Sequence, residues 1–205
     1  MRKLTVLAAL VLALVAAPAA FGQQIAGTPH DLSGAGYGTT QICIFCHAPH
    51  NAIVPMLAPL WNHTSTAATY TVYAGIGTLN ATPGQPTGPS RACLSCHDGS
   101  VAIDAYQGHT GTVNMTGPAL LGTDLSNDHP ISFAYNTALA TADGGLVAPA
   151  VNSVGTAPAL PLFTSGGTSG MLECATCHQV HSNQFVPFLR MSNGASALCL
   201  KCHIK

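Results

Sequence analysis

Four copies of one short motif, Cys-x-x-Cys-His, contain every cysteine of this 205-residue chain. The copies are CIFCH, CLSCH, CATCH and CLKCH, and they begin at Cys43, Cys93, Cys174 and Cys199. Two residues three positions apart lie on one side of a helical turn, and the histidine follows at the next position. The spacing therefore predicts four helical turns, each presenting two sulfurs and an imidazole to one ligand.

The histidine after each second cysteine separates three explanations of this pattern. Eight cysteines in an exported chain would suggest disulfides, and paired Cys-x-x-Cys motifs would suggest zinc, but neither requires that histidine. Cys-x-x-Cys-His is the pattern of covalent c-type haem attachment, with the histidine as the proximal iron ligand. We predict four haem c groups. They are bound by Cys43, Cys46, Cys93, Cys96, Cys174, Cys177, Cys199 and Cys202, with proximal ligands His47, His97, His178 and His203.

The composition indicates a chain with little aliphatic core. Charged residues make up 6% of the sequence, against about 25% in typical soluble proteins, and there are 21 glycines and 14 prolines. We expect the fold class to be a multihaem c-type cytochrome. Such a protein is mostly irregular coil, with short helices at the CxxCH motifs, few strands and the haem chain as the core. The apoprotein is then not expected to fold.

The first 22 residues have the pattern of a cleaved signal peptide. Arg2 and Lys3 precede an apolar run, and small residues follow at the expected cleavage point after Gly22. A transmembrane anchor is the alternative, but the run is shorter than the roughly 20 residues that span a bilayer. We therefore expect an exported mature chain, with no later transmembrane segment. Its net charge of −1 before cleavage offers no basic patch for nucleic acid.

Six further histidines are candidates for the second axial position of each iron. His50 and His181 each follow a proximal histidine by three residues. A histidine so placed cannot reach the opposite face of its own haem, so we predict that both ligate neighbouring haems. An ordinary surface histidine is the alternative for each. Methionine is the other common ligand, but the methionines here have no distinctive context and are assigned to packing.

Two other histidines complete the predicted set of distal ligands. His129 lies between Asp128 and a proline. An aspartate beside a ligand histidine can orient the imidazole ring through a hydrogen bond. His30 precedes every haem motif and is followed by Asp31. We predict that both are ligands, and that His30 ligates a haem of an adjacent subunit, with ligation inside its own chain as the rival. His63 remains ambiguous, and His109 in a glycine-flanked loop is not expected to bind iron.

The motifs also suggest duplication. The first and third copies have the form CxxCHxxH, and the second and fourth have the form SxxCLxCH. We therefore predict one tetrahaem domain, residues 23–205, built from two dihaem modules at about 30–130 and 131–205. Four haems would carry more propionates than the mature chain has basic side chains. A calcium site is therefore a further prediction, and its candidate ligands are Asp104, Asp124, Asp128 and Asp143.

Several longer segments carry a family resemblance. The sequences HDLS, CIFCHAPHN, APLWNHT, CLSCHDGSVAI, LGTDLSNDHPISF, CATCHQVHSNQFVPFLRM and LCLKCH resemble the doubled-CxxCH family of exported multihaem cytochromes. The four-motif order is similar to the OmcE type, tetrahaem cytochromes that polymerise into extracellular filaments. The resemblance implies a continuous chain of bis-histidine haems, with one ligand histidine donated across the subunit interface.

These features predict electron transfer without bond-making chemistry, so the chain is not expected to be an enzyme. We expect a conductive homopolymer at the cell surface or outside the cell, whose partners are redox proteins or extracellular acceptors. Few surface charges favour such assembly. A soluble periplasmic tetrahaem shuttle is the main alternative, and a multihaem reductase is the third. A reductase would need an open axial position, which the surplus of histidines disfavours.

Overall fold

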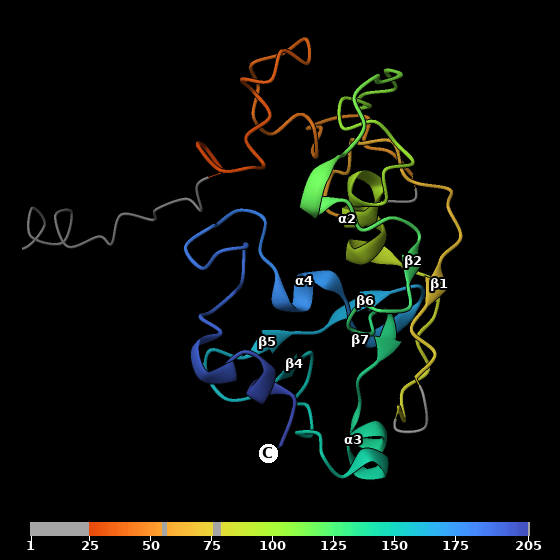
Figure 1. Ribbon diagram of the computed structural model, residues 1–205, viewed down its shortest axis with the longest axis vertical. Helices are drawn as coiled ribbons and strands as arrows, with labels where there is room; N and C mark the ends of the chain where they lie inside the picture. The colour runs from red at the N-terminus through yellow and green to blue at the C-terminus, as the bar shows by residue number, and fades with distance from the viewer. Residues whose placement is uncertain (1–24, 55–56, 76–78, 205) are drawn as a thin grey trace, which may run out of the picture.

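The computed structural model describes residues 25–54, 57–75 and 79–204. The predicted signal peptide, residues 1–22, lies outside the described residues. Most of the described chain is irregular coil and turn, and the regular elements are short (Figure 1). The prediction of low helix and strand content is confirmed.

Helical turns occur where the motifs lie. The second motif forms the end of α2 (Gly88–His97), the third forms α4 (Cys174–Cys177), and the fourth begins the 3-10 helix η3 (Cys199–Lys201). The first motif is a hydrogen-bonded turn, in which the His47 amide donates to the Cys43 carbonyl at 2.8 Å. Each motif thus folds as one turn of chain that gathers its two sulfurs and its imidazole, as the spacing predicted.

Local sequence explains where the longer helices begin and end. In α2, Pro89 stands in the first turn, where a missing amide proton costs nothing. In α3 (Thr137–Asp143), the Asn136 side chain accepts a hydrogen bond from the Leu139 amide at 2.8 Å. The helix ends at Gly144, whose φ of 72° is the left-handed conformation that glycine adopts readily. Two further 3-10 turns are η1 (Gly117–Ala119) and η2 (Gly194–Ser196).

The strands of the described residues form three small sheets. The parallel pair β1–β2 joins Thr71–Val72 to Asp124–Leu125, and the antiparallel pair β4–β5 joins Ser153–Val154 to Leu160–Pro161. The third sheet has the antiparallel order β3–β7–β6. Its strands are β3 (Phe133–Ala134), β6 (Phe163–Ser165) and β7 (Thr168–Leu172). Strand β7 leads directly into α4, which packs beside α2, so the sheet holds the second and third motifs together (Figure 1).

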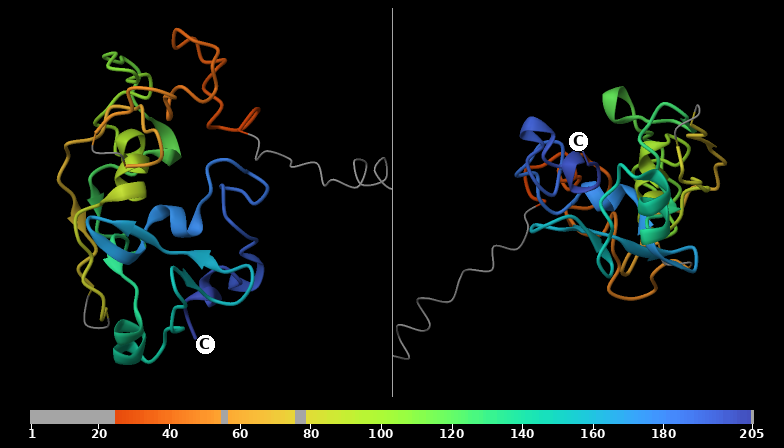
Figure 2. Two further views of the ribbon diagram at one scale, coloured as in Figure 1. Left: turned by 180° about the vertical axis from the view of Figure 1, so that it is seen from behind. Right: turned by 90° about the horizontal axis from the view of Figure 1, so that it is seen from below.

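The apolar core is small and lies mainly in the second half of the chain. One cluster of eight buried residues surrounds β3, β5 and β7, and a second of three joins Tyr70, Leu94 and Leu125. The segment that carries the first motif lies at one end of the molecule and the C-terminus lies toward the other, as the view from behind shows (Figure 2, left). The proposed boundary between dihaem modules near residue 130 stays a prediction.

Candidate haem-binding site

The proximal histidines of the first three motifs are oriented by backbone carbonyls. In each of them the ring nitrogen Nδ1 lies within hydrogen-bond distance of a carbonyl oxygen. The contacts are His47 to Pro59 at 2.6 Å, His97 to Ala119 at 2.8 Å, and His178 to Pro187 at 3.0 Å. A hydrogen bond at Nδ1 fixes the tautomer and leaves Nε2 with a lone pair for a metal ion. This arrangement is the one an axial iron ligand requires.

The surroundings of the first and third motifs form a structural repeat. The residue after each proximal histidine donates its amide to a carbonyl, from Ala48 to Leu60 at 2.8 Å and from Gln179 to Phe188 at 2.7 Å. Leu60 and Phe188 share a positive φ, at 54° and 56°. The backbone carbonyl of the second cysteine in each motif also accepts a hydrogen bond. The donor to Cys46 is the Asn62 amide, and the donor to Cys177 is the Arg190 amide. In this repeat His50 corresponds to His181.

Three proximal histidines face a second histidine. The ring centroids are 6.1 Å apart for His97 and His30, 6.0 Å for His47 and His181, and 6.4 Å for His203 and His129. Two imidazoles that share a metal ion have centroids about 6 Å apart, given metal–nitrogen bonds of about 2.0 Å on each side. The centroid spacing of all three pairs is therefore the one expected for two imidazoles on one iron.

His30 has the environment of a ligand held inside its own chain. Burial, followed by the nearby charges of His97, His181 and His178, lowers the pKa of His30 to about 4, so its ring is neutral at pH 7. Its Nδ1 is buried and has no hydrogen-bond partner among the described residues. A neutral imidazole with an unused lone pair is suited to bind iron. The position beside His97 favours the rival of the expectation that His30 reaches an adjacent subunit.

His50 and His178 are the two predicted ligands that the described chain does not pair. Both side chains are exposed, and neither ring has a facing imidazole at the spacing of the other three pairs among the described residues. His181, the counterpart of His50 in the repeat, faces the proximal histidine of the first motif. By the same relation, the proximal histidine that corresponds to His50 as a partner is that of the third motif, His178, although the two rings are not in contact among the described residues.

The remaining two histidines have other surroundings. His63 is 1% exposed, and its ring nitrogens lie 2.8 Å from the Thr64 carbonyl and 3.0 Å from the Ala102 carbonyl. Burial lowers the pKa of His63, and a neutral ring donates through one nitrogen only, so one of these two carbonyls accepts its proton; its Nε2 also lies 3.5 Å from the Cys96 sulfur. His109 is exposed, and its ring packs against Tyr106 with centroids 5.7 Å apart.

The thiols of successive motifs lie near one another. A hydrogen bond from Cys93 lowers the pKa of Cys174. Burial, then the charge of Cys46, raises the pKa of Cys96 to about 12. Burial, then the charges of Cys174 and Cys199, raises the pKa of Cys177. All eight cysteines are free of disulfides, and these charge effects indicate that the thiols of successive motifs are near one another.

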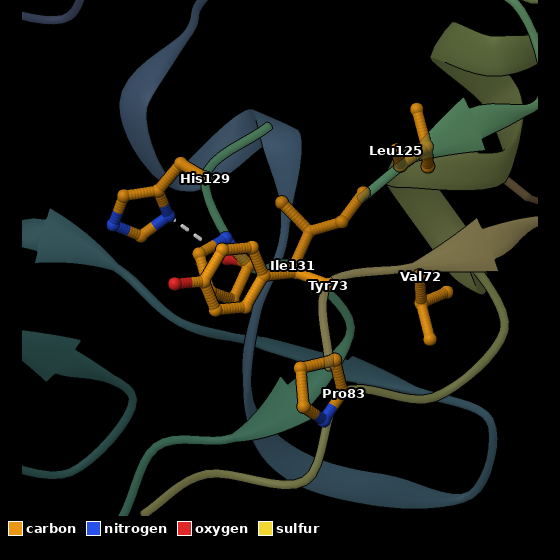
Figure 3. A pocket seen from close by; sticks show the side chains of 7 residues that line it. Val72, Tyr73, Pro83, Leu125, His129 and Ile131 are labelled. Atoms are coloured by element: carbon orange, nitrogen blue, oxygen red, sulfur yellow. Dashed lines mark hydrogen bonds between the residues drawn. The ribbon is translucent and has the colours of Figure 1, made fainter. Parts of the chain in front are cut away.

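His129 stands at the edge of a small apolar hollow. Val72, Leu125 and Ile131 line this hollow, and the His129 Nδ1 lies 2.9 Å from the Pro130 carbonyl, drawn as the dashed line in Figure 3. The contact leaves the Nε2 of His129 available, as in the proximal histidines. Apolar side chains beside a candidate ligand suit the flat apolar face of a porphyrin.

The predicted calcium ligands do not converge. Asp104 accepts amide hydrogen bonds from Thr112 and Val113, and Asp143 accepts one from the Asn80 side chain. No group of three or more His, Cys, Asp or Glu side chains able to hold a metal ion occurs in the described residues. A calcium site is therefore not proposed further.

Sequence reasoning missed two buried carboxylates beside the motifs. Asp98 follows His97 and accepts hydrogen bonds from the Thr66 and Tyr70 hydroxyls at 2.6 and 2.5 Å. Glu173 precedes Cys174 and is 1% exposed. The only signal in the sequence was their position next to a motif, which says nothing about burial. The prolines whose carbonyls contact the proximal histidines, Pro59 and Pro187, were also missed. Each is followed by one aliphatic and one aromatic residue, at the same place in the repeat.

Comparison with known families supports the chemistry of the site. The family described as "Doubled CXXCH motif" matches residues 168–205, which contain the third and fourth motifs. No curated protein matches the chain. The doubled motifs indicate covalently attached haem c and electron transfer. No helix in the described parts of the chain has the length and apolar character needed to cross a membrane.

Proposed function

We propose that the chain is an exported tetrahaem cytochrome that polymerises outside the cell and conducts electrons along a continuous row of haems. Each haem is held by one CxxCH motif, and the haem iron supplies the one-electron chemistry. The chain's own residues attach, orient and space the haems, and no residue performs bond-making catalysis. Electrons enter from a redox protein and leave to an extracellular acceptor.

The observation that carries this proposal is the unequal use of histidines. Three proximal histidines already face a distal histidine, whereas His178 and His50 are both exposed and unmatched. A patch on one copy that binds a different patch on the next makes a heterologous contact, which propagates into a filament when it does not close. We therefore assign His50 of one copy as the distal ligand of the His178 haem in the next copy, in place of His30.

Exposed apolar side chains support assembly. The described chain exposes several large apolar side chains, including Val54 at 88%, Val151 at 90% and Val186 at 74%. Val54 follows the first motif and Val186 follows the third, so both lie in the segments that carry His50 and His178. Apolar side chains next to an unpaired ligand and its unpaired partner suit a contact between copies.

The soluble periplasmic shuttle remains the second candidate, for one reason. The structural repeat relates His50 to His181, so closure of His50 onto His178 of the same chain would complete four bis-histidine haems in a monomer. No ligand would then be left for a neighbour. A reductase is the third candidate and would keep one iron without a distal histidine.

The His50→Ala variant tests the link between copies. We expect it to be exported with four haems, to show one high-spin haem, and to form no filaments, because the axial bond between copies is lost. Electron microscopy and the ferric electron paramagnetic resonance spectrum measure the two effects. The His109→Ala variant is the control, since His109 is exposed and contacts only Tyr106 among the rings of the described residues.

Dilute wild-type protein distinguishes the two candidates. A dissociated monomer with three low-spin haems and one high-spin haem agrees with ligation across copies. A monomer with four low-spin haems means that His50 closes within its own chain, and it would contradict the filament contact proposed here.

A further inference from the structure

The carboxylate of Glu173 is buried without a basic partner among the described residues. Its side chain is 1% exposed, and it stands between β7 and α4, directly before Cys174. The three described Lys and Arg side chains all donate elsewhere: Arg91 to the Thr66 carbonyl, Arg190 to Ala175, and Lys201 to Thr156. Burying a charge without compensation is costly. An ionised carboxylate in this place therefore needs both hydrogen bonds and a positive charge.

Four hydroxyl groups supply the hydrogen bonds. Ser132 donates to Oε2 at 2.7 Å, and Thr87 donates to Oε1 at 3.1 Å. Ser90 also donates to Oε2, and Ser165 also donates to Oε1. These donors come from α2 and its N-cap, from the residue before β3 and from the end of β6. Residues far apart in the sequence thus converge on this one side chain.

Two of these hydroxyls are themselves held as donors to Glu173. The Ser90 oxygen accepts the Cys174 amide at 2.8 Å, and the Ser132 oxygen accepts the Thr87 amide at 3.2 Å. Because an amide proton already points at each oxygen, the hydroxyl proton is free to point at the carboxylate. Four converging donors are the environment of an ionised carboxylate, which only accepts hydrogen bonds.

The haem irons would supply the positive charge that this carboxylate lacks. Glu173 adjoins Cys174, and the Ser90 oxygen that accepts the Cys174 amide lies in α2, the helix that carries Cys93 and Cys96. The carboxylate is therefore enclosed between the second and third attachment points. An oxidised bis-histidine haem carries one more positive charge on its iron than a reduced one. A fixed negative charge nearby stabilises the oxidised form, and burial weakens solvent screening of that effect.

We propose that Glu173 is a buried electrostatic group that lowers the reduction potentials of the haems at Cys93–Cys96 and Cys174–Cys177. It touches neither iron, and it acts by its charge at the junction of the two motifs. One electron donated by a neighbouring haem or a redox protein would remove one unit of positive charge from the iron, and the favourable interaction with Glu173 would weaken. The inference rests on the proposed attachment of haem to these two motifs.

The Glu173→Gln variant tests this role, because it keeps the shape of the side chain and removes the charge. We expect the midpoint potential of the affected haems to rise. At a fixed applied potential, the ratio of oxidised to reduced haem should fall about tenfold, which is about 59 mV for one electron. The Glu173→Asp variant keeps the charge and should remain near wild type. Asp124→Asn is the control, since Asp124 is exposed.

Intact mass separates the two ways in which the experiment can fail. Glu173→Gln protein that carries its haems at unchanged potentials overturns the electrostatic role and leaves a purely structural one. Wild-type protein without haem at these motifs overturns the proposed function itself.

A second variant applies if Glu173→Gln does not fold. Ser165→Ala keeps the charge of Glu173 but removes one hydroxyl donor, whose dipole partly cancels the field of the carboxylate. The reduction potentials of the two haems should therefore shift downward, in the direction opposite to that expected for Glu173→Gln. An upward shift or no shift overturns the proposal.

Discussion

Mature chain produced without haem attachment is expected to have no stable tertiary structure. In the described residues, the larger apolar clusters are one of eight buried residues and one of three, and long coil segments connect them. So little apolar burial does not offset the entropy of ordering a chain of this length, which costs about 1–2 kcal/mol per residue for the backbone alone. The haems must provide the missing contact surface. The segment before α2, with the first motif, should be the most affected.

Export in cells that lack haem attachment enzymes provides the material for this experiment. Circular dichroism, thermal melting and limited proteolysis should show rapid cleavage and no cooperative transition, while the haem-loaded protein melts cooperatively and resists the protease. Apoprotein that melts cooperatively near the temperature of the loaded protein would contradict the account of the core.

Replacing His181 should change the spin state of a haem far away in the sequence. The His181 ring faces His47 at 6.0 Å with an interplanar angle of 20°. In the His181→Ala variant we therefore expect the haem of the first motif to become high-spin, although His181 lies three residues after the third motif's proximal ligand. The haem attached at Cys174 and Cys177 should keep its own spectrum. Ferric electron paramagnetic resonance measures the change.

A double variant identifies which haem responds. If Cys43 and Cys46 are both replaced by alanine, the first haem is absent, and adding His181→Ala should create no further high-spin signal. A new high-spin signal in that background would mean that His181 serves a different haem. His109→Ala in the same background is the matched control, because it removes an imidazole that faces no proximal histidine.

The local structure of the motifs was predictable from their spacing, and the pairing between them was not. Cys-x-x-Cys-His fixes one helical turn, because every atom involved lies within five residues. The pairing of His47 with His181 depends on how two segments more than a hundred residues apart pack together. The spacing CxxCHxxH showed only that His181 could not reach the haem of its own motif, which limited the choice of partner without naming it.

The carboxylates show a second limit of sequence reasoning. Glu173 and Asp98 are single acidic residues next to a motif, and nothing in the pattern distinguishes them from exposed ones such as Asp124. Their burial arises from hydroxyl groups contributed by distant segments, as with Ser132 and Ser165 around Glu173. His63 is similar: its contacts with the Thr64 and Ala102 carbonyls become visible only when the two loops are in place.

The mass of the exported protein tests the central claim most directly. If each CxxCH motif binds one haem, intact mass spectrometry should give the mass of the mature polypeptide plus about 2.5 kDa, from four haems of about 0.6 kDa each. Thiol titration of the unfolded protein should find no free cysteine, because all eight sulfurs are in thioether bonds. A smaller mass increase, or any pair of reactive thiols, would contradict the assignment of four haems.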